Sequence, residues 1–343
     1  MEKIKVSNDI IDHSVEGEES ENNSKSSLGL SSKVFMLLNK YTIVWIVVLT
    51  GIVLYFLNGN FATFSNLTSV LRQSAFVGIG AIGMTFVIMG GGIDLSIPGI
   101  VSLTAVVTAM LVPSVGILAA VLAALLCGLA QGFLNGLVIT KLNIPPFVAT
   151  LGTGFVYLAI VFIITNQQVI PVTSMDVLNL GVGSLLGIPI PFIIFVLCTV
   201  FCIYLTKYTR YGRFIRAVGS KMEASVIAGV PVHRVIIFSF MVLGLMTSLT
   251  GVTLAGYLSA ANGTMGTGYE LQAIAAAVVG GTSLRGGNGT FIGTLAGSIF
   301  FAMISNALDL FGIGSYWQYI ATGLIIIFAI TLDGLKNKKS GTV

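Results

Sequence analysis

The strongest constraint on this chain is a series of apolar runs, each close to the length that a helix needs to cross a lipid bilayer. The hydrocarbon core of a bilayer takes about 20 residues of helix, within a range of about 17–25. Only 9% of the 343 residues are charged and 55% are hydrophobic, whereas a soluble domain carries about 25% charged residues. So few charges cannot cover a water-facing surface, and we expect lipid to surround most of the chain.

Ten runs qualify as candidate spans, and they predict an all-α, polytopic membrane helix bundle. Two of them, the third and the eighth, are short and interrupted by glycine. The ten ranges are 41–58, 70–90, 97–113, 115–140, 147–165, 189–206, 235–258, 272–284, 290–307 and 316–333.

The basic residues predict the orientation of these spans, because Lys and Arg are enriched in cytoplasmic loops. With ten spans and a cytoplasmic N-terminus, the basic residues around the spans face the cytoplasm, and only Arg72 disagrees. Nine spans would break this pattern, so both termini are predicted to be cytoplasmic. The basic residues are therefore interpreted as anchors at helix ends, and no nucleic-acid partner is predicted.

Charge also divides the chain into segments. Residues 1–33 are polar and predict a disordered cytoplasmic tail, because seven of the 13 acidic residues lie among the first 21. Residues 34–335 are predicted to form the transmembrane domain, with a basic cytoplasmic loop at 207–234. Residues 336–343 are predicted to form a second cytoplasmic tail. No signal peptide is recognised, so the first run is interpreted as a retained helix. The cysteines at 127, 198 and 202 lie in apolar runs and are interpreted as packing residues.

A first glycine-rich break, GGGIDLSIPG, occupies residues 90–99. Three consecutive glycines stop a helix, and Pro98 suits the first turn of the next one. Asp94 and Ser96 then have two interpretations. In an ordinary cytoplasmic turn, either side chain would cap the next helix by accepting its free N–H groups. Alternatively, both line a translocation path, because irregular backbone at membrane depth is tolerated only inside protein or along a cavity.

A second break, GGTSLRGGNG, occupies residues 280–289. It matches the first when Gly91, Gly92 and Leu95 are aligned with Gly280, Gly281 and Leu284. Paired glycine breaks in the two halves of a transporter can mark an internal repeat and the binding site. Neither break contains the Gly-Lys-Ser/Thr of a phosphate-binding loop, so nucleotide binding is not predicted.

The basic loop at 207–234 predicts a short amphipathic helix. Glu223 lies at its start, Gly229 terminates it, and Pro231 prevents it from resuming. Contact with lipid head groups explains part of the charge. The loop is nevertheless longer than orientation requires, so we expect it to receive a partner.

Polar residues inside the spans have two interpretations as well. Gln131 and Asn135 lie one helical turn apart, and most such residues make hydrogen bonds between helices. They could instead line a path for a hydroxylated solute. The glycines at 128, 132 and 136 predict close helix contact on a neighbouring face. No catalytic residue, metal site or cofactor is predicted, because there are two histidines, no Ser-His-Asp set and no paired membrane carboxylates.

Three segments together resemble the permease subunits of bacterial ATP-binding-cassette (ABC) importers for ribose and related monosaccharides. They are GGGIDLSIPGIVSL at 90–103, GRFIRAVGSKMEASVIAGV at 212–230 and AIAAAVVGGTSLRGGNGTFIGTLAG at 273–297. The similarity extends over about residues 40–335. The loop also fits the importer pattern Glu-Ala-Ala, three residues, Gly, with Ser225 in place of the second alanine.

The resemblance implies a multi-pass permease of the bacterial inner membrane that carries a ribose-like monosaccharide and has no ATPase site of its own. It implies three partners: a cytoplasmic ATP-binding subunit, an extracytoplasmic sugar-binding protein, and a second permease copy, identical or different. The residues that would contact the ATP-binding subunit are Gly212, Arg213, Glu223, Ala224 and Gly229.

Other functions stay open at this stage. A permease for a furanose similar to autoinducer-2 fits the same motifs, and a stand-alone secondary carrier or channel fits the hydropathy. A branched-chain amino acid is disfavoured, because an anionic substrate favours buried Arg or Lys and only Arg285 is a candidate. An intramembrane enzyme would need a nucleophile and base, which the sequence does not provide.

Overall fold

The computed structural model describes residues 42–314, 316–318, 320–325, 327 and 331. Both predicted tails and parts of the tenth predicted span lie outside these residues. The described residues from Ile46 onward form one compact unit, and every contact discussed below lies within it. The elements are α3 (Thr42–Leu57), α4 (Phe64–Met89), α5 (Ile97–Leu142), α6 (Pro146–Thr165), β1 (Ile170–Pro171), α7 (Met175–Val182), β2 (Ser184–Leu185), β3 (Ile188–Pro189), α8 (Ile190–Tyr208), α9 (Arg210–Ser220), α10 (Met222–Ile227), α11 (Val232–Leu258), β4 (Ala260–Ala261), α12 (Tyr269–Val279) and α13 (Phe291–Leu310).

Helices make up nearly all of the regular structure, and the strands are two-residue pieces. Six of the described helices, α4, α5, α6, α8, α11 and α13, are long and apolar enough to cross a membrane. Large apolar side chains also face outward, as at Leu118 (74% exposed) and Ile163 (73%), which is expected where lipid replaces water as the solvent. The predicted all-α membrane helix bundle is therefore confirmed. The number of ten spans and their orientation stay predictions.

The 46-residue α5 is two helices joined by a sharp turn. Gly116 has φ 77° and ψ 170°, a non-helical conformation inside the element. The amide nitrogen of Asn135 lies 2.8 Å from the hydroxyl of Ser96, although a straight helix would separate residues that far apart in sequence by about 58 Å. The halves 97–115 and 117–142 are therefore antiparallel, which confirms the third and fourth predicted spans as separate helices.

Close helix packing occurs where the sequence predicted it. The α5 glycines Gly128, Gly132 and Gly136 lie directly against the backbone of α11, so that a methyl group at any of the three would overlap a main-chain atom. Small residues allow such approach and let two backbones share a long dry interface. This contact fixes the second half of α5 along α11.

The two glycine breaks share one backbone geometry. The N–H of Gly91 donates to Ile88 O (2.9 Å), and that of Gly281 donates to Val278 O (2.8 Å). Both glycines have positive φ, 83° and 92°, which a side chain would strain. Gly91 is therefore equivalent to Gly281. The predicted alignment, which paired Gly92 with Gly281, is wrong by one residue, because the first run carries a third glycine that the second lacks.

The start of α4 and the end of α12 differ from the predicted positions, and local capping or turn geometry explains each difference. α4 begins six residues earlier than predicted, because Thr63 accepts a hydrogen bond from the Asn66 N–H. α12 ends at Val279 and not at residue 284, because the chain turns at Gly280 and Gly281. The described residues between 316 and 331 are all helical, in agreement with the tenth span.

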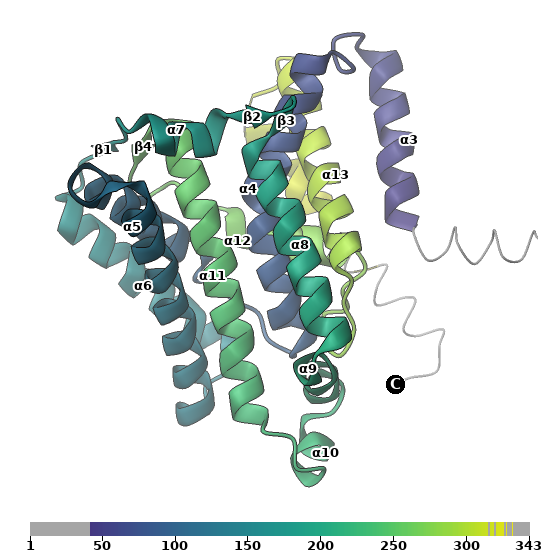
Figure 1. The fold of residues 1–343 in the computed structure, drawn as a ribbon. Helices are drawn as coiled ribbons and strands as arrows, with labels where there is room; N and C mark the ends of the chain where they lie inside the picture. Colours follow the sequence, from purple (N-terminus) through teal and green to yellow (C-terminus); the bar gives the residue numbers. More distant parts are fainter. Residues whose placement is uncertain (1–41, 315, 319, 326, 328–330, 332–343) are drawn as a thin grey trace, which may run out of the picture. The chain divides into compact units, whose positions relative to one another are not determined.

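The connecting segments gather at the two ends of the helices in Figure 1. At one end lie α7 and the short strands, where Ile170 of β1 pairs with Ala261 of β4. The helices α9 and α10 lie at the opposite end. The basic loop thus forms two helices, where the sequence predicted one.

Candidate functional site

Three of the four predicted path residues meet in one polar cluster, which we define as Asp94, Ser96, Asn135 and Tyr157. The N–H and the hydroxyl of Ser96 both donate to Asp94 Oδ1 at 2.6 Å. Asn135 Nδ2 donates to Asp94 Oδ2 (3.2 Å) and to Ser96 Oγ (2.8 Å). The cluster therefore ties the break after α4 to the second half of α5.

The hydrogen bonds of the cluster offset the cost of burying the Asp94 side chain, which is fully buried. A buried carboxylate loses its hydration, and this loss is offset only if its oxygens accept hydrogen bonds. Bonds to a charged acceptor are also the stronger ones, worth about 1.5–3 kcal/mol each. Both oxygens of Asp94 accept bonds from neutral donors, and no cation of the described residues pairs with this carboxyl group.

The cap interpretation of Asp94 and Ser96 is wrong. Ser96 is the residue before α5, but its side chain accepts no N–H from the first turn of that helix. Asp94 accepts the N–H of Ser96 itself, two residues away. A solvent-facing turn is excluded as well, because both side chains are buried.

The helix α6 completes the cluster with residues that the sequence analysis missed. The hydroxyl of Tyr157 donates to Asn135 Oδ1 at 2.9 Å and lies 3.1 Å from the carbonyl of Gln131. Thr150 accepts the N–H of Leu95 at 2.9 Å. A tyrosine inside an apolar run was a usable signal, since a buried hydroxyl needs a partner. Its partner could not be read from the sequence.

Gln131, the fourth predicted path residue, lies beside this cluster and differs from its members. Its side chain is 4% exposed, and its Nε2 has no hydrogen-bond partner among the residues that the structure describes. An unpaired buried donor costs about 1–3 kcal/mol. The unpaired amide therefore distinguishes Gln131 from the fully paired side chains of the cluster.

The five predicted coupling residues fall into two groups. Arg213, Glu223, Ala224 and Gly229 are exposed on α9, α10 and the turn that follows them. Gly212 is buried, and a methyl group there would overlap the carbonyl of Thr206 at the end of α8. Gly212 thus seats α9 against α8, whereas the other four are accessible. α10 also exposes apolar side chains, including Ile227 at 88%.

α9 packs against both glycine breaks, and Gly219 makes the tightest of these contacts. A methyl group at Gly219 would overlap the carbonyl of Met89 and press against the N–H of Gly287. The same N–H donates to Met89 O at 2.9 Å, which joins the two breaks to each other. The end of α9 therefore packs, backbone against backbone, where α4 ends and where α12 is connected to α13.

Fold and site together define a class of protein: a polytopic helical membrane protein with broken helices, a buried polar cluster and an exposed helical loop. Comparison with known proteins identifies the family. The family model described as "Branched-chain amino acid transport system / permease component" matches residues 66–330. The chain belongs to this permease family. It is accordingly a permease subunit of the ABC importer class and a multi-pass protein of the bacterial cytoplasmic membrane.

Curated relatives cover most of the chain. The ribose import permease of Bacillus subtilis is 39% identical over 291 residues, which are 83% of this chain and 90% of the relative. The ribose import permease of Escherichia coli K12 is 37% identical over 286 residues (82% and 89%). The D-allose transport system permease of E. coli K12 is 34% identical over 280 residues (81% and 86%). No solved structure matches the chain.

Proposed function

We propose that this chain forms the membrane path of an importer for a ribose-like monosaccharide, driven by a separate ATP-binding subunit and supplied by an extracytoplasmic sugar-binding protein. The observation that carries the proposal is the similarity to two ribose import permeases over more than four fifths of the chain. A furanose similar to autoinducer-2 is the second candidate cargo, because it would present the same hydroxyl chemistry.

The chemistry of the buried side chains supports a neutral, hydroxylated cargo. The fully buried polar side chains of the described residues carry hydroxyls and amides, together with the carboxylate of Asp94, while Arg72 and Glu270 are only partly buried. Arg285, the candidate partner that the sequence indicated for an anionic substrate, is exposed, and the partly buried Arg72 donates to the carbonyl of Val182. Hydroxyls and amides both donate and accept, so they match a sugar better than an amino acid carboxylate. This argument disfavours the cargo in the family description.

Uptake into vesicles that contain the chain with its ATP-binding subunit and binding protein tests the cargo. Labelled ribose should enter only when ATP is supplied to the ATP-binding subunit. Other pentoses, hexoses such as allose and an autoinducer-2-like furanose form the comparison panel. Uptake of ribose without ATP would favour a secondary carrier, and ATP-driven uptake of leucine but not ribose would overturn the proposed cargo.

The contacts of α9 suggest how movement of the ATP-binding subunit would be transmitted to the translocation path. The ATP-binding subunit would dock on the exposed side of α9 and α10, at Arg213, Glu223, Ala224 and Gly229. Movement of α9 would shift Met89 and Gly287 through Gly219, and the break after α4 would transmit it to Asp94. Asp94, Ser96, Gln131 and Asn135 would then change partners as the path opens. Ten spans, two cytoplasmic termini and a paired permease complete the proposed arrangement.

Glu223→Lys tests the docking surface. Glu223 is exposed, so the substitution should leave membrane insertion and thermal stability unchanged, within about 0.5 kcal/mol. A reversed charge at the interface should weaken binding of the ATP-binding subunit by at least tenfold, or about 1.4 kcal/mol. Co-purification and uptake are the measurements.

A matched charge reversal provides the control for this experiment. Lys141→Glu changes an exposed residue at the end of α5 that is not assigned to the docking surface. It should leave binding of the ATP-binding subunit intact. Normal binding and uptake in Glu223→Lys would remove α10 from the proposed interface.

A further inference from the structure

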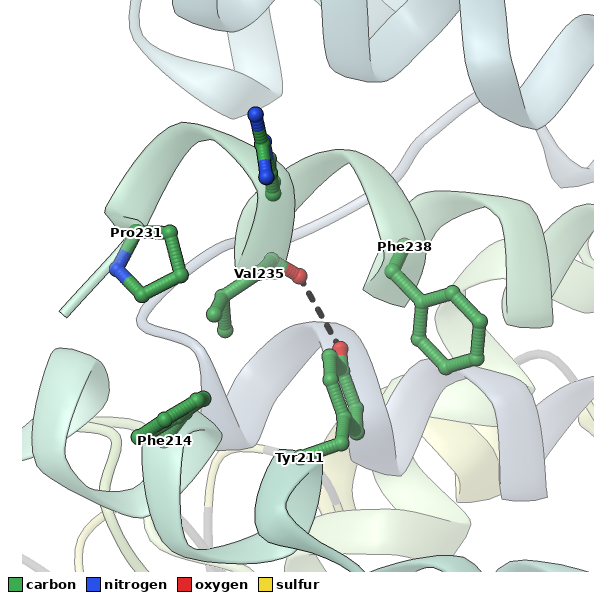
Figure 2. Close-up of a pocket in the computed structure, with 6 residues that line it drawn as sticks. Tyr211, Phe214, Pro231, Val235 and Phe238 are labelled. Carbon is green, nitrogen blue, oxygen red and sulfur yellow. Dashed lines mark hydrogen bonds between the residues drawn. The ribbon is translucent and has the colours of Figure 1, made fainter.

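The helix α11 is held to its neighbours by different contacts along its length. At its first turns, the hydroxyl of Tyr211 in α9 donates to Val235 O at 3.0 Å, as Figure 2 shows. Two turns farther along, Gly83 of α4 lies directly against the backbone of Leu243, so that a methyl group at Gly83 would overlap it. The first contact is a direct hydrogen bond, and the second is dry packing of two helices. The α4 side of α11 has neither kind of contact two turns after Leu243.

The hydroxyls of Thr247 and Thr250 in this part of α11 make no hydrogen bond to any described residue, although the two side chains are only 0% and 1% exposed. A serine or threonine inside a helix often donates to a carbonyl one turn earlier, and Ser239, Ser248 and Thr253 of α11 all do so. The two unpaired hydroxyls are therefore turned away from the α11 backbone. Because they lie three residues apart, they share one face of the helix.

The neighbouring part of α4 leaves a small space beside one of these hydroxyls. A methyl group at Gly80 would meet only Thr250 Oγ1, at 3.9 Å. Gly80 is buried, and at every other buried glycine of the described residues a methyl group would lie 3.1 Å or less from another atom. At Gly78 of the same helix, for example, the ring of Phe195 fills the corresponding space. Gly80 thus leaves room for one small group next to an unpaired hydroxyl.

Size and polarity determine which group fits this space. A buried water needs a polar site with about two to four hydrogen-bond partners, and the hydroxyls of Thr247 and Thr250 supply two. The α4 backbone, which Gly80 leaves uncovered, supplies a third, since each carbonyl oxygen has a second lone pair. A monosaccharide is far larger than the methyl group that would fit here, so the space does not match the cargo.

We propose that a water molecule is bound between α4 and α11 beside Gly80, with the hydroxyls of Thr247 and Thr250 as its partners. A water that bridges two polar groups is enthalpically nearly as good as a direct hydrogen bond. The water therefore joins α4 to α11 at this level, as the hydroxyl of Tyr211 joins α9 to α11 at the other. The proposal does not depend on which solute the protein carries.

Gly80→Ala distinguishes a hydrated space from a dry one, because the added methyl group would displace the water. In the full-length chain purified in detergent, this substitution should lower the melting temperature by about 2–4 °C, even though alanine is the better helix former. In a chain that also carries Thr247→Val and Thr250→Val, the space has lost both hydroxyls. There Gly80→Ala should raise the melting temperature, because only the gain in helix propensity remains.

Two matched variants control for the substitution itself. Gly80→Ser provides a hydroxyl that can take the place of the water beside Thr250. It should melt at a higher temperature than Gly80→Ala, although serine has the lower helix propensity. Gly152→Ala changes an exposed glycine of α6 with open space around it, and it should lower the melting temperature in neither background.

A higher melting temperature for Gly80→Ala in the parent background would indicate a dry space and overturn the proposal. An equal loss in both backgrounds would indicate steric overlap and would overturn it as well, as would a Gly80→Ser variant no more stable than Gly80→Ala. If Gly80→Ala does not insert, the unmodified chain decides the question. In a crystallographic or cryo-EM map that shows ordered waters elsewhere in the interior, density should lie about 2.7–3.0 Å from Thr250 Oγ1. Such a map without this density would contradict the proposal.

Discussion

Asn135→Leu is expected to destabilise the protein by at least about 3 kcal/mol, because it removes every bond that Asn135 makes in the polar cluster. Asp94 Oδ2 would lose its donor while staying buried, and Tyr157 would lose its acceptor on Asn135. Leucine branches at the same carbon as asparagine and leaves no cavity, so the loss comes from the missing hydrogen bonds together with the larger volume of the two methyl groups. The melting temperature of the purified protein in detergent measures it.

Exchanging the side chains of Asp94 and Asn135 tests whether the hydrogen bonds stabilise the protein, or whether any substitution in this region would destabilise it. In the double variant Asp94→Asn, Asn135→Asp, the cluster keeps one carboxylate and one amide, and their facing atoms remain donor and acceptor. This variant should recover most of the stability that Asn135→Leu loses. A double variant as unstable as Asn135→Leu would show that the pairing of these groups is not what stabilises the site.

Thr140→Val provides the matched control on the same half of α5. The Thr140 side chain is buried and donates to the carbonyl of Gly136, one turn earlier in its own helix. Its removal leaves no charged group without a partner, so the cost should stay below about 1 kcal/mol. A loss as large as that of Asn135→Leu would mean that any buried polar group here matters equally.

Gly219→Ala is expected to reduce transport far more than its single methyl group suggests. The methyl would overlap the carbonyl of Met89, and relief requires α9 to move away from both glycine breaks. Overpacking of this kind costs about 1–3 kcal/mol, which corresponds to about 5–150-fold in the population of the docked arrangement. ATP-driven uptake should fall by a factor in this range, while the amount of protein inserted in the membrane stays unchanged.

Gly152→Ala is the control for the glycine substitution itself. Gly152 lies in α6 with open space around it, so alanine should be neutral or stabilising by up to about 1 kcal/mol. If Gly219→Ala transported as well as Gly152→Ala does, α9 would not transmit movement through its contact with Met89 and Gly287.

The sequence predicted the helices because their causes are local. Apolar length set the spans, and glycine breaks set the ends of α4 and α12 to within a few residues. The spacing of Gly128, Gly132 and Gly136 predicted a close contact, since a four-residue period places small residues on one face of a helix. The motifs at 90–103, 212–230 and 273–297 resembled one family of permeases, and the comparisons confirm that family.

The prediction of the site was incomplete, because the site is formed by contacts between segments that are distant in the sequence. Asp94 and Asn135 were selected as polar residues in apolar surroundings, but nothing in their spacing indicated that the turn at Gly116 brings them together. Tyr157 was passed over, because its importance depends on the angle at which α6 meets α5. Gly212 was assigned to a docking surface, whereas packing against α8 buries it.

The sequence by itself therefore determined that this protein lies in a lipid bilayer, that it is helical, and that it belongs to a permease family. These follow from residue composition and local periodicity, which act over one or two helical turns. Only the tertiary structure decided which polar groups satisfy the buried carboxylate of Asp94 and how α9 meets the two breaks. Hydrogen bonds and steric overlap act over a few ångströms, so they depend on a register between helices that no single segment encodes.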